Sequence, residues 1–120
     1  MKALPIALSA ALLAASAAAQ VAPAPQLSLE HRMLLRCSAA FALVAYRQES
    51  GDPEVAQYPP LKQRGGEFFV RASARVMDEA GLDRAAISKA LEAEARALLQ
   101  GGTLTAIMPV CLSALDASEP

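Results

Sequence analysis

Two cysteines, Cys37 and Cys111, are the first residues in this chain whose types could do chemistry. A redox-active pair usually has the spacing Cys-x-x-Cys, with one thiol activated at a helix N-terminus. These two cysteines are far apart in the sequence, and each lies among apolar residues that are expected in mid-helix. In an exported protein of this size we therefore predict a structural disulfide between them. Two buried thiols or an intermolecular bridge are the alternatives.

Glu94 is the one charged residue inside an otherwise apolar helical stripe. The apolar members of this stripe are Ile87, Leu91 and Leu98. Because a buried carboxylate needs a compensating partner, we predict an ion pair with an arginine of the first helix, either Arg36 or Arg32. The alternatives are a desolvated functional carboxylate in a cleft and an exposed position at the rim of the bundle.

His31, the only histidine, has no local partner for catalysis. It lies beside Glu30 and Arg32 at the expected start of a helix, and no G-x-S-x-G motif accompanies it. We predict a surface residue, since one histidine alone makes a weak pH switch. Two cysteines and one distant histidine are also too few ligands for a metal site. With no nucleophile–base pair and no phosphate loop, we predict a protein that is not an enzyme and holds no cofactor.

A set of large apolar side chains could line a pocket for a lipid or a partner helix. The set comprises Phe68, Phe69, Met33, Met77 and Met108. Because apolar residues at helical spacing are more often core residues, we predict that these side chains simply fill the core.

The first of the helices that must position these residues is predicted over 29–49. Ser28 is its expected N-cap, and Gly51 and Pro53 end it. Its main stripe includes Cys37, and its opposite side carries Leu35, Leu43 and Tyr46. A helix that is apolar on all sides is normally covered on more than one side, so we predict a central helix.

A second long helix is predicted over 61–80, closed by Gly81. Its expected core stripe is Leu61, Phe68, Phe69, Ala72 and Val76. Its opposite stripe is expected to face water and comprises Arg64, Glu67, Arg71, Arg75 and Asp78, with Glu67 and Arg71 as the best i,i+4 pair. Gly65-Gly66 would cost on the order of 2 kcal/mol inside a helix. Either the helix begins at Glu67, or these glycines permit close contact with a neighbour.

Two further helices complete the prediction. The third starts at the N-cap Asp83, with Leu82 and Ile87 as a hydrophobic staple, and runs to about Gln100. The fourth is predicted over 104–115, where Pro109 must kink it unless the helix starts only at about Met108.

The chain shows no strand alternation, no repeat and no second domain. We therefore predict an all-α compact bundle of about four helices with one disulfide, preceded by a cleaved signal peptide. The expected helical domain spans 28–116, and a polar tail spans 117–120.

The first 19 residues predict export. A basic start at Met1-Lys2 precedes an apolar segment over 3–15, and an Ala-x-Ala signature places cleavage between Ala19 and Gln20. The alternative is an uncleaved membrane anchor, for which residues 3–19 have only the minimum length. Gln20, not a cysteine, comes directly after the cleavage site, so no new N-terminal cysteine can carry a lipid anchor. We therefore predict a periplasmic protein without stable membrane insertion. Residues 20–27 are expected to form a flexible Pro/Ala leader.

Charge and composition narrow the possible partners. The chain has 11 Lys+Arg and 12 Asp+Glu, with the two signs interleaved along it. No basic field exists to attract nucleic acid, so we predict no nucleic-acid partner. Aromatic residues make up only 4% of the chain and tryptophan is absent, so few large side chains are available to build the core.

Four short strings in the chain resemble a group of uncharacterised small secreted two-cysteine proteins of Gram-negative bacteria. These strings are Arg36-Cys37-Ser38-Ala39-Ala40-Phe41, Tyr58-Pro59-Pro60-Leu61, Phe68-Phe69-Val70-Arg71 and Pro109-x-Cys111-Leu112. The resemblance implies a secreted helical protein and carries no activity with it. In architecture alone, the chain is also similar to the HdeA-type periplasmic acid-stress chaperones.

We interpret the sequence as that of a periplasmic, non-enzymatic helical binding or interaction protein with an unknown protein partner. An acid-type stress chaperone is the main alternative, and an immunity protein to a secreted toxin is another.

Overall fold

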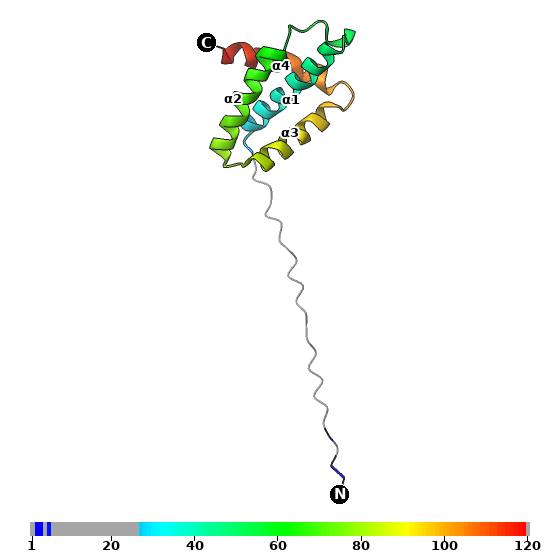
Figure 1. Ribbon diagram of the computed structural model, residues 1–120, viewed down its shortest axis with the longest axis vertical. Coiled ribbons are helices and arrows are strands. Elements are labelled where there is room, and N and C mark those ends of the chain that lie inside the picture. Colours follow the sequence, from blue (N-terminus) through cyan, green and yellow to red (C-terminus); the bar gives the residue numbers. More distant parts are fainter. Residues whose placement is uncertain (1, 4, 6–26, 120) are drawn as a thin grey trace.

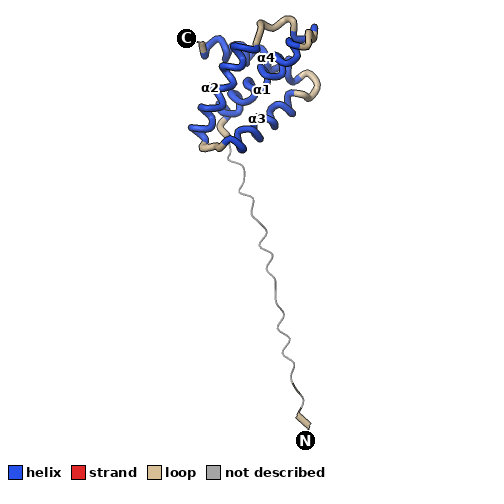
Figure 2. Tube along the Cα trace, in the orientation of Figure 1, coloured by secondary structure: helices blue, strands red, loops and turns tan. Residues whose placement is uncertain are grey.

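The structure, a computed structural model, describes residues 2, 3, 5 and 27–119. Apart from residues 2, 3, 5 and 27, the predicted signal peptide, its cleavage site and the predicted leader lie outside the described residues. Within the described part, the chain forms four α-helices and one short 3-10 helix, with no strand (Figure 2). The predicted all-helical fold is therefore confirmed. No helix in this described part is both long and apolar enough to cross a membrane.

Helix α1 (Leu29–Glu49) is the central element. The Ser28 hydroxyl caps it by accepting a hydrogen bond from the backbone N–H of His31 at 3.0 Å. The helix lies between α2 and α3 and contacts α4 as well (Figure 1). Its covering is less complete than predicted, because the Tyr46 side chain is 72% exposed while Leu35 on the same side is fully buried.

Helix α2 (Lys62–Ala80) is continuous through both glycines, so the predicted alternative of a start at Glu67 is wrong. Gly65 is buried against α1, where an added Cβ would lie only 2.9 Å from the Cβ of Phe41. This close approach lets the Phe68 ring pack edge-on against the Phe41 ring, with centroids 5.2 Å apart. Phe69 is only half-buried, so its predicted place in the core is wrong.

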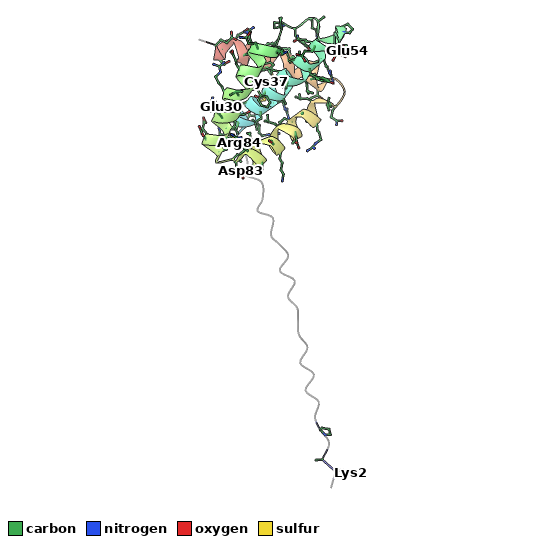
Figure 3. The ribbon with its side chains drawn as sticks, viewed as in Figure 1. Lys2, Glu30, Cys37, Glu54, Asp83 and Arg84 are labelled. Carbon is green, nitrogen blue, oxygen red and sulfur yellow. A yellow bond between two sulfur atoms is a disulfide. The ribbon has the colours of Figure 1, made fainter. Side chains whose placement is uncertain are left out.

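Helices α3 (Arg84–Leu98) and α4 (Thr103–Ser118) follow. Asp83 caps α3 as predicted, its carboxylate accepting a hydrogen bond from the Ala86 N–H at 2.8 Å. Figure 3 labels Asp83 and Arg84 at the turn that joins α2 to α3. Pro109 lies inside α4, so the predicted alternative of a start at Met108 is wrong. The helix runs to Ser118, three residues beyond its predicted end at residue 115.

Buried apolar side chains form two clusters. The larger lies between α1, α2 and α4 and includes Phe41, Leu61, Phe68, Met108 and Leu115. The smaller lies where α1, α2 and α3 meet and consists of Leu35, Val76, Leu82 and Ile87. The Leu82–Ile87 staple therefore belongs to the smaller cluster, and it fixes the angle at which the chain enters α3.

Candidate functional site

The disulfide between Cys37 and Cys111 joins α1 to α4, as the sequence predicts. The Cα atoms of the two cysteines are 5.1 Å apart, which is a normal separation for a disulfide. Cys37 is 2% exposed and Cys111 is fully buried. Because a reactive cysteine needs access and a polar surrounding, this pair has the position of a structural link rather than that of a redox centre.

Arg36 and Glu94 form an ion pair between α1 and α3. The Arg36 Nε donates to a Glu94 carboxylate oxygen at 2.8 Å, and the two side chains are 29% and 13% exposed. Glu94 thus contacts Arg36 and not Arg32, the other predicted partner. The contact with Arg36 compensates the negative charge of Glu94, which lies on the apolar face of α3.

His31 is more covered than the surface position predicted for it. Its side chain is 14% exposed, and its Nε2 lies 3.1 Å from a carboxylate oxygen of Glu79 on α2. The C-terminal half of α2 runs beside the start of α1, and this proximity covers the imidazole. Glu79 also accepts a hydrogen bond from the Arg75 Nε at 2.6 Å, and Arg75 donates to Glu30 at 2.6 Å. The hydrogen bond from Arg75, followed in size of effect by the one with His31, holds the pKa of Glu79 below its usual value.

Arg64 makes the second charged connection. It donates to both carboxylate oxygens of Glu119, at 2.7 and 2.9 Å, and to Asp116 at 2.9 Å. These bonds hold the pKa of Glu119 below its usual value. The predicted water-facing stripe of α2 is exposed except at Arg64, which is partly buried. Arg64 and Arg75 in addition bond across to α4 and α1. The predicted Glu67–Arg71 pair is not among the ion pairs of residues 27–119.

A hollow of about 250 Å³ opens beside the disulfide, between α1, α2 and α4. Six apolar residues line it: Met33, Leu34, Cys37, Phe68, Val110 and Ala114. We call it the apolar hollow. Glu30 is its one charged lining residue, and Glu30 and Cys37 are both labelled on the ribbon in Figure 3. Of the predicted pocket set, only Met33 and Phe68 line this hollow, whereas Met108 is fully buried in the core and Met77 packs on the smaller cluster.

A second hollow, of about 150 Å³, shares two walls with the first. We call it the arginine hollow, because Arg71 and Arg75 line it together with Leu34, Phe68, Ala72 and Ser118. Leu34 and Phe68 line both hollows, so the two spaces adjoin at these side chains.

Sequence reasoning missed Val110, Ala114 and Arg71 as lining residues. Val110 and Ala114 are four residues apart and lie beside the cysteine stripe of α4, which makes the apolar face of that helix wider than its core requires. This extra width of the apolar face was the sequence signal that could have indicated a hollow beside α4.

No group of three or more histidine, cysteine or acidic residues in the described part of the chain is placed to hold a metal ion. Comparison of the chain with protein-family models, with curated proteins and with solved structures found no match. Any inference about function therefore rests on the residues of this chain and their geometry.

Proposed function

We propose that this protein is an exported, periplasmic, non-enzymatic binding protein whose binding surface is the apolar hollow. The observation that carries the proposal is an opening to solvent beside Cys37 and Phe68, two side chains that are otherwise almost fully buried. Apolar surface left open on a small domain marks a site for a ligand or a partner. Val110, 50% exposed at the edge of the hollow, adds to this uncovered surface.

Three contacts support a non-enzymatic role. The imidazole of His31 is engaged by the Glu79 carboxylate, and the hydroxyl of buried Ser38 donates to the Leu34 carbonyl of its own helix at 2.7 Å. The cysteine sulfur atoms are joined to each other. The side chains of the usual nucleophiles and bases at these positions are therefore occupied in structural contacts.

Titration with Nile red, an uncharged apolar dye, tests the proposed binding surface. We expect saturable binding at one site by the oxidised protein. Ala114→Leu adds carbon atoms inside the hollow and should abolish this binding, whereas Leu99→Ala changes an exposed apolar residue that lines neither hollow and should leave it unchanged. Dye binding that is absent, or that survives Ala114→Leu in a folded protein, would contradict the proposal.

An acid-stress chaperone is the second candidate, and the charged connections of α2 favour it. The contacts of Arg75 and Arg64 with α1 and α4 all end on carboxylates. Protonation in acid removes these contacts, loosens α2 and uncovers the apolar walls at Leu34 and Phe68. This candidate predicts that the protein suppresses aggregation of an unfolded client at about pH 3 but not at neutral pH, because loosening of α2 in acid uncovers more apolar surface than the hollow exposes at neutral pH. Light scattering of the client measures this, and equal scattering with and without the protein in acid would exclude the chaperone role.

A further inference from the structure

We propose that the two hollows together bind one molecule of a fatty acid, with the hydrocarbon chain in the apolar hollow and the carboxylate on Arg71. This inference rests on the proposed binding role and adds the chemical class of the ligand.

The apolar hollow has the lining that a hydrocarbon chain requires. Apart from Glu30, every lining residue is apolar, and Phe68 and Cys37 provide buried walls. An alkyl chain transferred from water onto such walls gains roughly 0.8 kcal/mol for each methylene group that becomes buried. Glu30 is the one polar lining residue, and one of its carboxylate oxygens is bonded to Arg75 at 2.6 Å, so the hollow offers few partners to a ligand that is polar along its length.

The cationic end has one arginine that remains available. Arg75 is engaged by both Glu79 and Glu30. Arg71 is exposed, and in the described part of the chain its guanidinium contacts only the Ser118 carbonyl, at 3.5 Å. The nearby Glu119 carboxylate feels the charge of Arg71, but it is held by Arg64 through two hydrogen bonds. Among residues 27–119, Arg71 is therefore a cation without a carboxylate of its own, and a guanidinium binds a carboxylate in bidentate geometry.

The size of the two adjoining hollows favours a ligand with a single hydrocarbon chain. Leu34 and Phe68 line both spaces, so a hydrocarbon chain that lies against these two side chains has its end next to the arginine hollow. The volumes of about 250 and 150 Å³ place the combined space at the small end of ligand pockets, which span roughly 300–1,000 Å³. That space suits one chain with a compact headgroup, and a carboxylate is smaller than the headgroup of a phospholipid.

Calorimetric titration of the delipidated, disulfide-bonded protein tests the ligand class, with dodecanoate below its micellar concentration as the probe. We expect one saturable site. Arg71→Gln should weaken dodecanoate binding about tenfold, which corresponds to the loss of one charge-assisted contact, and should leave binding of uncharged dodecanol unchanged. Arg84→Gln is the matched control, because Arg84 is an exposed arginine at the start of α3 that lines neither hollow.

Two further variants test whether the hydrocarbon chain of the ligand lies in the apolar hollow. Val110→Asp places a negative charge at the edge of the apolar hollow and should abolish dodecanoate binding, while Leu99→Asp adds the same charge to an exposed apolar residue elsewhere and should not. Since both residues are at least half exposed, both variants should fold, and circular dichroism checks this.

The outcomes separate the ligand class from the binding role. Nile red binding without binding of dodecanoate, or with dodecanoate binding that Arg71→Gln leaves unchanged, overturns the fatty-acid inference and keeps the proposed function. Failure of both probes overturns both proposals. A second copy of this chain is the remaining candidate occupant of the hollow, and sedimentation velocity tests it. A dimer that Val110→Asp dissociates would place the second copy in the hollow and overturn the inference.

Discussion

At the scale of single residues, the Arg36–Glu94 pair shows how this small core tolerates a charge. Glu94 lies on the face of α3 that packs toward α1, and its carboxylate is only 13% exposed. The hydrogen bond from Arg36 compensates part of the lost hydration, so the pair aligns α3 on α1 rather than marking a reactive group.

Replacement of Glu94 by glutamine removes the charge and keeps the shape. We expect Glu94→Gln to lower the free energy of unfolding by about 1 kcal/mol, because Arg36 then loses its charged partner in a partly buried place. A double-mutant cycle with Arg36→Gln should give a coupling energy of at least about 0.5 kcal/mol. Glu92→Gln, an exposed carboxylate of the same helix, is the control and should have little effect. Equal effects of Glu92→Gln and Glu94→Gln would show that the pair does not stabilise the fold.

The lowered pKa values of Glu79 and Glu119 predict a specific pH dependence. A carboxylate with a lowered pKa in the folded state contributes stability above the ordinary pKa of 4.5, and this contribution is lost as the pH falls through the lowered value. The double variant Glu79→Gln, Glu119→Gln should therefore have a lower urea midpoint than the wild type at neutral pH and the same midpoint in strong acid. Glu67→Gln, an exposed carboxylate of α2, should follow the wild-type profile. A constant difference at all pH values would refute these two carboxylates as the acid-sensitive groups.

At the scale of elements, the adjacent glycines of α2 have opposite surroundings. An added Cβ at Gly65 would meet the Cβ of Phe41 at 2.9 Å, whereas one at Gly66 would meet nothing within 4 Å. The Phe41 Cβ is attached directly to the backbone of α1, so it cannot move aside as the end of a flexible side chain would.

This contrast predicts that replacement by alanine changes the stability of the fold in opposite directions at the two glycines. Gly66→Ala should stabilise the fold by about 1 kcal/mol through helix propensity alone. Gly65→Ala should destabilise it by about 1–2 kcal/mol, because the separation of α1 and α2 must increase and the overpacking outweighs the same propensity gain. Urea denaturation of both variants measures the difference, and stabilisation by Gly65→Ala would mean that α1 and α2 do not approach this closely.

The local signals in the sequence predicted the helices well, because each signal acts within one turn. Ser28 and Asp83 cap helices where their side chains reach the first free N–H groups, and Gly81 ends α2 with a φ of 67°. The errors concern contacts between helices. Phe69 and Tyr46 have apolar side chains at suitable spacing, but their burial depends on which neighbour lies opposite.

The same limit applies to the candidate site. The cysteine pair was predictable, because two cysteines leave only one intramolecular pairing. The partners of Arg64 and Arg75 were not, because long side chains on α2 can bond either along their own helix or across to α1 and α4. The apolar hollow depends on how three helices meet, and no periodicity within one helix reports that.

At the scale of the whole molecule, the disulfide links the central helix to the last one over a sequence separation of 74 residues. A loop of this length corresponds to about 4–5 kcal/mol in the chain-entropy account. A domain of this size has a total stability of roughly 5–10 kcal/mol, so the disulfide supplies much of it.

Reduction should therefore lower the urea midpoint severely and unfold much of the protein at body temperature. Circular dichroism with and without reductant measures this loss. The double variant Cys37→Ala, Cys111→Ala is the control, since reductant should not change its midpoint. An oxidised and a reduced wild type with the same midpoint would mean that packing alone holds α4 on α1.

Export of the oxidised domain is the claim on which the proposed binding role depends, and intact mass analysis tests it most directly. The protein is isolated from the periplasmic fraction of a bacterium that expresses the full chain, with thiols alkylated before purification. We expect the mass of residues 20–120 with two hydrogen atoms fewer and no alkyl group, which corresponds to cleavage after Ala19 and to a Cys37–Cys111 disulfide. A mass that retains Met1, or one that carries two alkyl groups, would contradict the account.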